Sequence, residues 1–566
     1  MTLYAAGTGG SGSAPSVLAT TKGFTNGTFY LSFILPTPVP APLYVVATGG
    51  DARGGANSAI KLMAAIGMSN AVPKGTIVIN ELTTVGSAYP LNQFADLTTP
   101  ENLGTSSTNH LGLINAMAVT SNLFSLQSGA LASFLANSSA CTGGSPPANC
   151  ATEEKLDTLA DIVAACVRTA GPSGAFPADC STLVGDSPAC DQLLCYTNTN
   201  DTLQAVLAMA RAPEAVNPST GRTLPFTLAT PASPFQPILS ATPNDLTLSL
   251  SYATGFSGAR IAIDSVGNVW FSGTNTFGEL APNGTLISPT AGFLGNGTIT
   301  SPEGLAIDAA LSVWIPNSAG VLTELRHNGS FAANYSGGGL SGSQTAAIDS
   351  FGNVWIANKS SDAVVKISPS GAFFSGADGF TGGGLANPKG LALDGFDNAW
   401  VGNDNGTVTE LDLNGNPVGA TPFSGGGLSN TDQLAIDPYG DAWAANQGND
   451  SISELDPTGV PISGVNGFTG GGLSAPSGIA IDAIGHVFVS DRRSGVGIAI
   501  SEFDSGGNPL SPNTGFFGVG LNSPHDLAID ASGNVWVNND NGSAITEFLG
   551  LAAPVKTPLQ GLPTSP

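Results

Sequence analysis

The chain has 566 residues and a mass of 56.4 kDa, which is long enough for two or three domains. Only 10% of the residues are charged, the net charge is −25 and the pI is about 4.1, so the surface repels nucleic acid and anionic membranes. The sequence has no basic cluster and no run of 18 uninterrupted apolar residues. It therefore predicts neither a nucleic-acid partner nor a membrane-spanning segment.

Residues 1–48 alternate short strands with loops, in the stretches TLYAAG, TFYLSFIL and LYVVATGG. The pattern predicts part of a small β-sandwich, similar to the prealbumin-like or Ig-like modules of surface proteins. The opening MTLYAAGTGG looks like the middle of a strand and has no signal-peptide pattern. We expect either that the natural N-terminus is missing or that the start codon was misassigned.

Residues 49–215 are predicted to form a helical domain, because apolar residues recur there at i, i+3 and i+4. The first expected helix begins at Asn57, which could cap it. The expected helices are NSAIKLMAAIGMS, TVGSAYPLNQFADL, NHLGLINAMAVTSNLF, TEEKLDTLADIVAACV and DTLQAVLAMARA. Residues 216–244 are rich in Pro and Thr, and we interpret them as a linker.

All six cysteines of the chain fall inside the predicted helical domain. They are Cys141, Cys150, Cys166, Cys180, Cys190 and Cys195. An even, clustered set in Pro- and Gly-rich surroundings indicates disulfides and an oxidising compartment, and fifteen pairings are possible. We predict the local pairs Cys141–Cys150, Cys166–Cys180 and Cys190–Cys195. Zinc is the rival interpretation, but the window has no CxxC and no His.

Residues 245–566 repeat one phrase seven times. Each copy has an Asp that closes an AID-like step: Asp264, Asp308, Asp349, Asp394, Asp437, Asp482 and Asp530. Six residues later comes an aromatic residue: Trp270, Trp314, Trp355, Trp400, Trp443, Phe488 and Trp536. These positions hold all six Trp residues of the chain. A repeat of about 40–45 residues that carries four short strands is typical of a β-propeller blade.

We therefore predict a mainly β, multidomain protein in which a seven-bladed propeller follows the helical domain, with six blades as the alternative. Each blade is expected to be a four-stranded antiparallel sheet. The strand around Leu246–Tyr252 is expected to complete the last blade and to close the ring.

The repeated aromatic and acidic residues each have two interpretations. The Trp rings are expected to fill the space between blades, and carbohydrate stacking is the less favoured interpretation. The Asp carboxylates are expected to accept N–H groups of the following turn. Calcium or magnesium binding is only weakly indicated, since one carboxylate per turn makes a poor cation site.

Two stretches, SGIAIDAIGHVFVSD and KGLALDGFDNAWVGN, resemble NHL-type repeats and the related streptogramin lyase (virginiamycin B lyase) propellers. The resemblance covers about residues 245–550. It implies a propeller fold and, as one possible activity, a lyase that uses His residues, a Glu and a magnesium ion on one face. The layout is also similar to that of secreted or cell-surface bacterial proteins that carry another region before such a propeller.

Candidate binding residues follow from the order of strands in a blade. The loops that join the second strand to the third, and one blade to the next, share the face that usually binds ligands. Six residues just before the first strand reach this face: Glu303, Gln344, Lys389, Asp432, Ser477 and His525. Arg492 and Arg493, in a second-to-third loop, are expected on the same rim as candidate anion contacts. His486 and His327 fall on the opposite face.

The expected function is binding without catalysis. The sequence has no GxSxG, HExxH or Walker A motif. The binding face offers one His and one Glu from different blades, which is too little for a His-based acid–base pair. We predict a secreted or cell-surface protein that presents one propeller face to a protein or carbohydrate ligand, or that self-associates. A streptogramin lyase-like enzyme and a structural subunit of an extracellular assembly are the alternatives.

Overall fold

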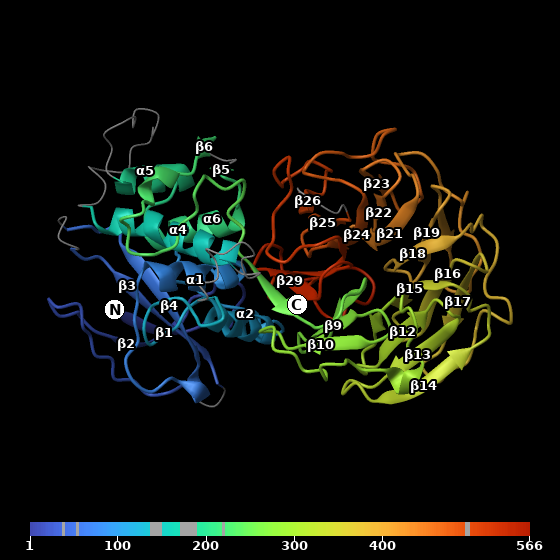
Figure 1. The fold of residues 1–566 in the computed structure, drawn as a ribbon, viewed down its shortest axis with the longest axis horizontal. Helices are drawn as coiled ribbons and strands as arrows, with labels where there is room; N and C mark the ends of the chain where they lie inside the picture. Colours follow the sequence, from blue (N-terminus) through green and yellow to red (C-terminus); the bar gives the residue numbers. More distant parts are fainter. Residues whose placement is uncertain (37–39, 52–55, 136–149, 170–188, 218–220, 493–497) are drawn as a thin grey trace. The chain divides into compact units, whose positions relative to one another are not determined.

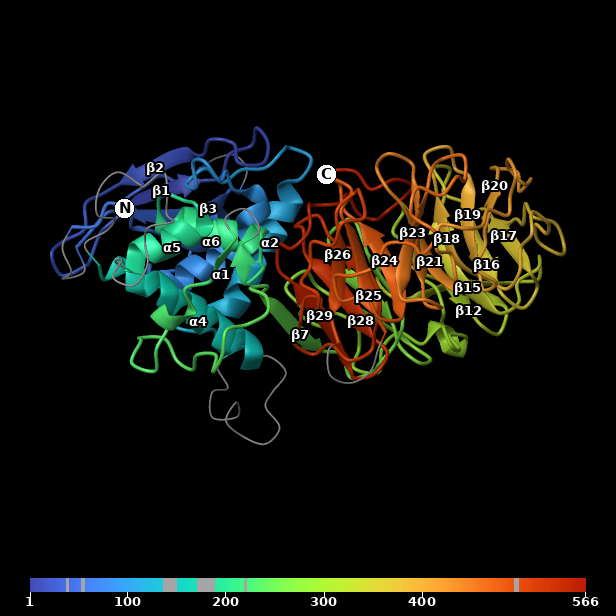
Figure 2. The same cartoon turned by 90° about the horizontal axis from the view of Figure 1, so that it is seen from above.

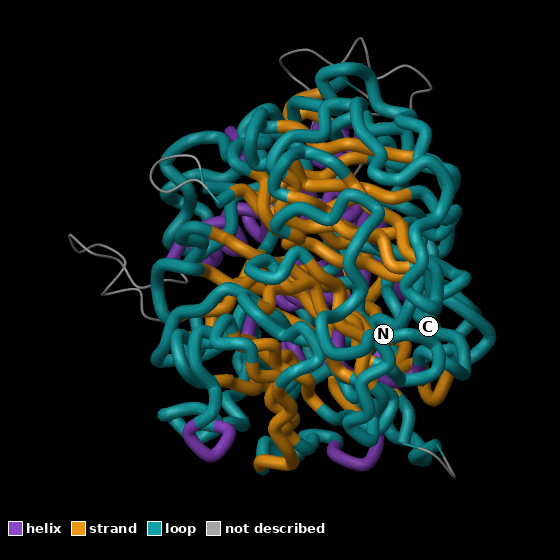
Figure 3. The backbone as a smooth tube through the Cα atoms, turned by 90° about the vertical axis from the view of Figure 1, so that its right-hand side faces the viewer, coloured by secondary structure: helices purple, strands orange, loops and turns teal. Residues whose placement is uncertain are grey.

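The computed structural model describes the whole chain except residues 37–39, 52–55, 136–149, 170–188, 218–220 and 493–497. The chain divides into two compact units. The first comprises Met1–Leu250 with Phe548–Leu551, and the second comprises Ser251–Glu547 with Ala552–Pro566. Strands and loops far outweigh helices (Figure 3). Among the helices of the described residues, none is both long and apolar enough to cross a bilayer.

The first unit is built on one antiparallel sheet with the strand order β2-β1-β3-β4. Its strands are β1 (Thr2–Ala5), β2 (Ser16–Thr20), β3 (Pro42–Thr48) and β4 (Lys61–Met68). The helices are α1 (Glu81–Leu91), α2 (His110–Leu123), α4 (Cys150–Val167), α5 (Ala189–Thr197) and α6 (Thr202–Arg211). Helices α1, α2 and α6 contact β4 (Figure 1). Strand β3 is buried along nearly its whole length.

The predicted helix NSAIKLMAAIGMS is wrong, because residues 61–68 form the edge strand β4. Hydroxyl groups of the helices satisfy the outer edge of this strand. The N–H groups of Met63 and Ala65 donate to Thr84 Oγ1 and Ser87 Oγ of α1, each at 2.9 Å. Asn57 caps no helix. It is buried, and its Nδ2 donates to the Cys166 carbonyl at 2.9 Å. Apolar spacing alone cannot reveal that another element supplies these partners.

The N-terminal region also differs from the predicted sandwich. The sheet of the first unit continues through β4, and helices cover it instead of a second sheet. The stretch TFYLSFIL forms no strand, and Tyr30 and Ile34 are largely exposed. Residues 1–48 are therefore one part of an α+β unit.

The segment predicted as a linker packs on α4. The N–H of Phe235 donates to Asp161 Oδ1 at 3.1 Å, and that of Leu239 donates to Thr158 Oγ1 at 2.9 Å. Upstream of these residues the segment carries a short hairpin of β5 (Val216–Asn217) and β6 (Arg222–Thr223). Side chains of α4 satisfy its backbone, so the segment belongs to the first unit.

Four cysteines, Cys141, Cys150, Cys180 and Cys190, lie outside the part of the chain whose side chains are described. The other two, Cys166 and Cys195, are buried, and neither is a free thiol. The predicted pairing stays a prediction.

The second unit consists of small antiparallel sheets of three or four strands, as expected for propeller blades. We number these repeat sheets 1 to 7 in chain order. Sheet 1 holds β8 (Ile261–Ile263), β9 (Val269–Ser272) and β10 (Phe277–Leu280). Sheet 2 holds β11 (Ala306–Ile307), β12 (Val313–Asn317), β13 (Val321–Leu325) and β14 (Phe331–Ser336). Sheet 3 holds β15 (Ser343–Ile348), β16 (Val354–Asn358) and β17 (Ala363–Ile367). Sheets 4 and 5 hold β18 (Pro388–Leu393), β19 (Ala399–Asn403) and β20 (Val408–Leu411); and β21 (Thr431–Ile436), β22 (Ala442–Asn446) and β23 (Ser451–Leu455). Sheets 6 and 7 hold β24 (Pro476–Ile481), β25 (Val487–Asp491) and β26 (Ile500–Phe503); and β27 (Pro524–Ile529), β28 (Val535–Asn539), β29 (Ala544–Phe548) and β7 (Ser249–Ala253).

Five repeat sheets have three strands and not the predicted four. In these sheets the expected fourth strand is reduced to isolated bridges, such as Ile452–Phe468 and Leu455–Pro461 in sheet 5. Proline at this position, in Pro417, Pro461 and Pro509, has no N–H to donate to a ladder. In sheet 7 the outer strand β7 lies next to β29 (Figure 2).

The first strands of the repeat sheets surround a common centre (Figure 1). Each contacts the first strand of the next sheet, and β27 of the last sheet contacts β8 of the first. We call these seven the inner strands.

The Trp residues of six repeats, and Phe488 in the sixth copy, are completely or almost completely buried. Trp355, for example, packs against Leu391, Leu393 and Leu411 of the next sheet. Its ring also lies 5.8 Å from that of Phe380, centroid to centroid, and five other Trp residues have an equivalent aromatic neighbour. Rings buried in this way cannot stack on a carbohydrate.

The repeated Asp organises the turn that follows the inner strand. In every copy its Oδ1 accepts the N–H groups two and four residues later, as Asp394 does from Phe396 and Asn398. In the six Trp-containing copies, Oδ2 accepts the indole N–H at 2.9–3.2 Å. One carboxylate thus fixes both the turn and the buried ring.

Candidate functional site

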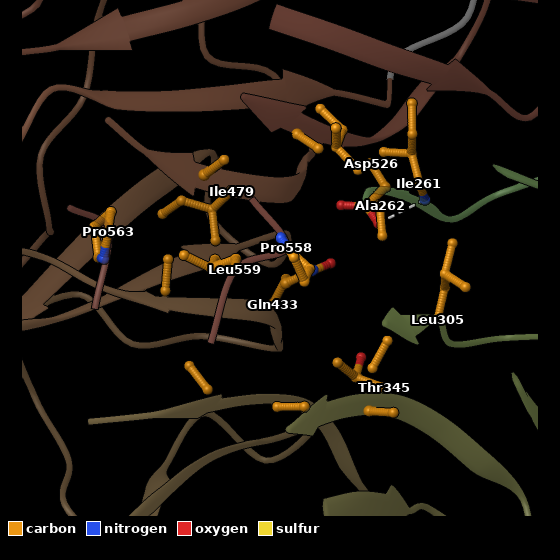
Figure 4. A pocket seen from close by; sticks show the side chains of 18 of the residues that line it. Ile261, Ala262, Leu305, Thr345, Gln433, Ile479, Asp526, Pro558, Leu559 and Pro563 are labelled. Carbon is orange, nitrogen blue, oxygen red and sulfur yellow. Dashed lines mark hydrogen bonds between the residues drawn. The ribbon is translucent and has the colours of Figure 1, made fainter. Parts of the chain in front are cut away.

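The inner strands enclose a cavity of about 190 Å³ (Figure 4). At the second position before each repeated Asp the lining residue is alanine: Ala262, Ala306, Ala347, Ala392, Ala435, Ala480 and Ala528. Aliphatic side chains such as Ile479 and Leu305 add to the lining. Because methyl groups are short, they leave open space along the centre of the ring.

A C-terminal segment, residues 552–566, closes one end of this cavity. We call this the turn end, because the repeated Asp turns lie there. Val555 N–H donates to the Asp530 carbonyl at 3.1 Å, and Thr557 Oγ1 donates to the Asp264 carbonyl at 2.8 Å. Pro558 and Leu559 then line the cavity (Figure 4).

One repeat differs at the turn end in a way that fits this segment. Copy six has Phe488 in place of Trp, so no indole N–H is available to Asp482. The N–H of Ala553 donates to Asp482 Oδ2 instead, at 2.9 Å. Asp482, in the one copy without Trp, therefore accepts a hydrogen bond from the C-terminal segment instead of from an indole.

The opposite end, which we call the mouth, is crossed by Arg260. Arg260 directly precedes β8. Its Nη1 donates to Gln433 Oε1 of sheet 5 at 2.7 Å, and its Nε donates to the Glu303 carbonyl at 2.7 Å. Arg260 is only 5% exposed, and within the described residues no carboxylate lies at ion-pair distance from it. Its remaining N–H groups can donate to a ligand oxygen.

His525 lies at the mouth and is only 5% exposed. Burial lowers its pKa well below the usual range, and the charges of Arg260 and Arg492 lower it further. The ring is therefore neutral near pH 7. Its Nδ1 is buried without a hydrogen-bond partner among the described residues, which is costly unless a ligand or water supplies one.

Two carboxyl groups at the mouth hold protons more tightly than usual. Burial raises the pKa of Asp526 to about 6, although Arg260 opposes the shift. Burial also raises the pKa of Glu303, with Arg260 acting against it and Asp540 with it. Asp526 Oδ2 accepts the Ile261 N–H at 3.3 Å (Figure 4).

Three of the predicted binding residues form a chain across neighbouring sheets. Lys389 Nζ lies 3.8 Å from Asp432 Oδ1, and Ser477 Oγ donates to Asp432 Oδ2 at 2.8 Å. Lys389 also pairs with Asp404 at 2.7 Å. Glu303 and His525 both lie within electrostatic range of Arg260 and Arg492. These five predicted residues therefore belong to one polar region.

The other predicted binding residues contribute less. Gln344 contacts the carbonyls of Gly342 and Ser343, both at 3.4 Å. Arg492 pairs with Asp540 at 2.6 Å, so its charge is largely neutralised. Arg493 lies outside the described residues. At the turn end, His486 Nδ1 lies 2.9 Å from Glu502 Oε1.

Sequence reasoning missed the polar residues one position further along each inner strand. Arg260, Thr345, Gln433 and Asp526 line the cavity, whereas the predicted set one position earlier does not. Side chains of a strand alternate between faces, so residues two apart share one face. They stand two positions before the Ala that recurs in every copy, so the repeat itself could have indicated them.

A magnesium ion, which the lyase resemblance implies, does not fit the mouth. Two arginines lie there, and Asp432 is already bound to Ser477 and Lys389. Within the described residues, no three acidic or histidine side chains at the mouth come close enough to hold a cation. The mouth is instead suited to a neutral or anionic group that accepts hydrogen bonds from Arg260.

A search of protein-family models finds no match, and no curated protein matches the sequence. Among solved structures, virginiamycin B lyase from Staphylococcus aureus is 14% identical with a TM-score of 0.43, over 54% of this chain and 99% of the lyase. A streptogramin B lyase is 15% identical with a TM-score of 0.40, over 53% and 97%. The designed protein Ika8 is 14% identical with a TM-score of 0.37, over 50% and 80%. Identity and TM-score are low, so the chemistry of this site rests on its own residues.

Proposed function

We propose that this chain is a non-enzymatic binding protein, whose repeat sheets are the seven blades of one closed propeller. Its mouth takes a carboxylate or carbonyl group of a protein or carbohydrate partner. The seven-fold Asp register and the contact between β27 and β8 support closure.

The unpartnered Nδ1 of His525 is the observation that carries the proposal. A buried polar atom without a partner is costly unless a ligand or a water satisfies it. Arg260 stands at the same mouth with N–H groups still available, and a guanidinium suits a carboxylate oxygen. Because His525 does not line the cavity itself, such a ligand would lie across the mouth, with a hydrogen-bond donor toward His525 and a carboxylate toward Arg260. An uronic acid, or a terminal carboxylate with its amide, carries both groups.

The same residues argue against proton transfer by histidine. A general acid or base works best when its pKa lies near the operating pH. The pKa of His525 is far below the usual range because of burial, so the ring stays neutral and does not exchange protons readily. A histidine in this state supports a role in binding more than a role in proton transfer.

A panel of acidic glycans and peptides, tested on the full chain by calorimetry, examines the proposal. For the ligand found, His525→Ala should weaken binding by about 1–3 kcal/mol, the cost of a lost buried hydrogen bond. The matched control is His486→Asn, which places at the turn end the residue that other copies have there. Equal affinity of the His525→Ala variant, or loss of affinity in the control, would contradict the site.

An enzyme at the mouth is the second candidate, supported by the raised pKa of Asp526, about 6. This carboxyl group could give or take a proton near neutral pH. Consumption of the bound ligand by the wild type, lost in Asp526→Asn, would favour this candidate over simple binding.

An extracellular or cell-surface location is part of the proposal. The clustered cysteines and the acidic, charge-poor composition support it. Mass spectrometry of unreduced peptides from natively produced protein should find no free thiol, and several alkylated cysteines would count against it.

A further inference from the structure

Three side chains meet beside each repeated turn. They are the repeated Asp, the residue four positions later, and the third-strand residue that faces them. In repeat sheets 1 to 7 the middle member is Asn268, Ser312, Asn353, Asn398, Asp441, His486 and Asn534. The third-strand member is Glu279, Glu324, Lys366, Glu410, Glu454, Glu502 and Glu547.

In most copies a donor side chain separates the carboxylates. Asn398 Nδ2 donates to both Asp394 Oδ2 (3.2 Å) and Glu410 Oε1 (3.0 Å). The middle residues of sheets 1 and 7 donate to their Glu in the same way, and His486 contacts Glu502. Sheet 3 uses Lys366, which pairs with Asp349 at 3.0 Å. Sheet 2 has Ser312, and its Glu324 accepts the Tyr335 hydroxyl at 2.8 Å.

Sheet 5 breaks this pattern, because its middle residue is Asp441. One carboxylate oxygen each of Asp437, Asp441 and Glu454 lie within 4.8 Å of one another. That span is about twice a Ca²⁺–oxygen bond of roughly 2.4 Å. Asp437 and Glu454 are buried, and Asp441 is partly exposed, which leaves a path from solvent.

Glu454 supplies a second, independent observation. The residue is buried, with only 4% of its surface exposed, and its Oε2 has no hydrogen-bond partner among the described residues. The equivalent glutamates of sheets 1, 4, 6 and 7 all accept a hydrogen bond from the middle residue. A buried carboxylate oxygen without any partner is costly, and a cation would satisfy it.

The charges around these three residues are also negative. Asp456, in the turn after β23, lies close enough to act on Asp441. Within the described residues, no Lys, Arg or His lies at ion-pair distance from Asp437, Asp441 or Glu454. No side-chain cation therefore takes the place that Lys366 fills in sheet 3.

We propose that Asp437, Asp441 and Glu454 of sheet 5 form a binding site for a hard divalent cation, with Ca²⁺ as the best fit. All of its ligand atoms are oxygens. Asp441 and Glu454 can supply up to two each, and Asp437 can supply Oδ2, because its Oδ1 already accepts two backbone N–H groups; water completes the shell. The site stands at the turn end, at the edge of the core, where the cation would tie the turn of Asp437 to β23. It is independent of the mouth and of what binds there.

Calorimetric titration of the chelator-treated full chain with Ca²⁺ tests the site. The wild type should bind one equivalent with a dissociation constant on the order of 10⁻⁴ M. Tb³⁺ should bind at the same place and emit on excitation of Trp443, whose Nε1 donates to Asp437 Oδ2 at 3.2 Å. Addition of Ca²⁺ should also raise the melting temperature.

Asp441→Asn is the decisive variant, because it copies the residue of sheets 1, 3, 4 and 7 and should fold. It should lower the affinity at least about tenfold, since even an outer-shell partner of a metal ligand is worth roughly 10–100-fold. Its melting temperature should no longer respond to Ca²⁺. Asp378→Asn, at an exposed residue that belongs to none of the repeated Asp turns, removes the same charge and should bind like the wild type.

Asn398→Asp provides the converse test in sheet 4, where Asp394 and Glu410 already stand. This variant should bind two equivalents of Ca²⁺ instead of one. Combined with Asp441→Asn, which removes the site of sheet 5, it should again bind one equivalent. The proposal is overturned if the wild type shows no saturable equivalent, or if Asp441→Asn and Asp378→Asn bind alike. The second outcome would mean that the overall charge attracts the ions.

Discussion

The two ends of the cavity are made by the same seven inner strands, and they differ in how strictly they repeat. At the turn end, every copy has the same Asp with the same two backbone contacts, and six copies add the same indole. At the mouth, the corresponding residues change from copy to copy: Arg260, Thr345, Gln433 and Asp526 alternate with glycines. The repeated residues make the contacts that every sheet shares, whereas the varied residues at the mouth make contacts that are specific to one sheet.

The largest expected effect comes from the buried ring of one repeat. Trp400→Ala should lower the free energy of unfolding by about 3–5 kcal/mol, because it leaves a cavity between sheets. Trp400→Phe, which reproduces the residue of copy six, should cost much less. Urea denaturation measures both. Similar losses in the two variants would mean that the indole N–H, and not the ring volume, carries the stability.

The next effect comes from the turn carboxylate. Asp394→Ala should destabilise the fold by about 1–3 kcal/mol, since it leaves the N–H groups of Phe396, Asn398 and Trp400 without their acceptor. Denaturation in parallel with Asp378→Asn, which has no such role, checks it. A loss no larger than that of the exposed control would remove the distinction between turn end and surface.

A third prediction concerns pH and the buried glutamates near the turns. Burial raises the pKa of Glu410 to about 7, above its value in the unfolded chain. The folded state thus holds a proton that the unfolded state has lost. Stability should therefore be greatest below about pH 4.5 for this group, and fall as the pH rises toward 7.

The ionisation of Glu410 should change the unfolding free energy by an amount on the order of 1–3 kcal/mol, because one pKa unit corresponds to about 1.4 kcal/mol. Glu410→Gln cannot ionise and should show a flatter decline of the unfolding free energy between pH 5 and 7. Asp412 has a lowered pKa and is ionised in both states over this window, so Asp412→Asn serves as the control. Parallel curves for the wild type and Glu410→Gln would contradict the prediction.

The smallest effect on stability is expected at the mouth. Arg492 pairs with Asp540 and its side chain is 40% exposed, and such exposed pairs contribute about 0.2–1 kcal/mol. Arg492→Ala should leave the unfolding free energy within about 1 kcal/mol of the wild type, as thermal denaturation would show. A loss comparable to that of Asp394→Ala would make the mouth as structural as the turn end.

Most sequence-based predictions for the second unit came from its repeat. The spacing of Asp and Trp indicated small sheets, their turns and their shared core, because each contact joins residues close in sequence or one repeat apart. The same reasoning failed for β4. Its hydrogen-bond partners Thr84 and Ser87 belong to helix α1, and the pattern of residues 61–68 does not predict them.

At the mouth, sequence placed Lys389, Asp432 and Ser477 together, and missed Arg260 and Gln433, which meet from opposite parts of the ring. Both stand two positions before the repeated Ala of their copy, but the repeat does not indicate that the side chains of copies one and five meet across the ring.

What the sequence determined by itself is the register: where each turn begins, which ring is buried, and which copies depart from the rule. What the tertiary structure decided is the meaning of those departures. Phe488 frees Asp482 for the C-terminal segment, and Asp441 brings three carboxylates together. The physical reason is that a repeat specifies contacts within and between neighbouring copies, whereas an orphaned acceptor or a crowded charge exists only once the chain has folded around it.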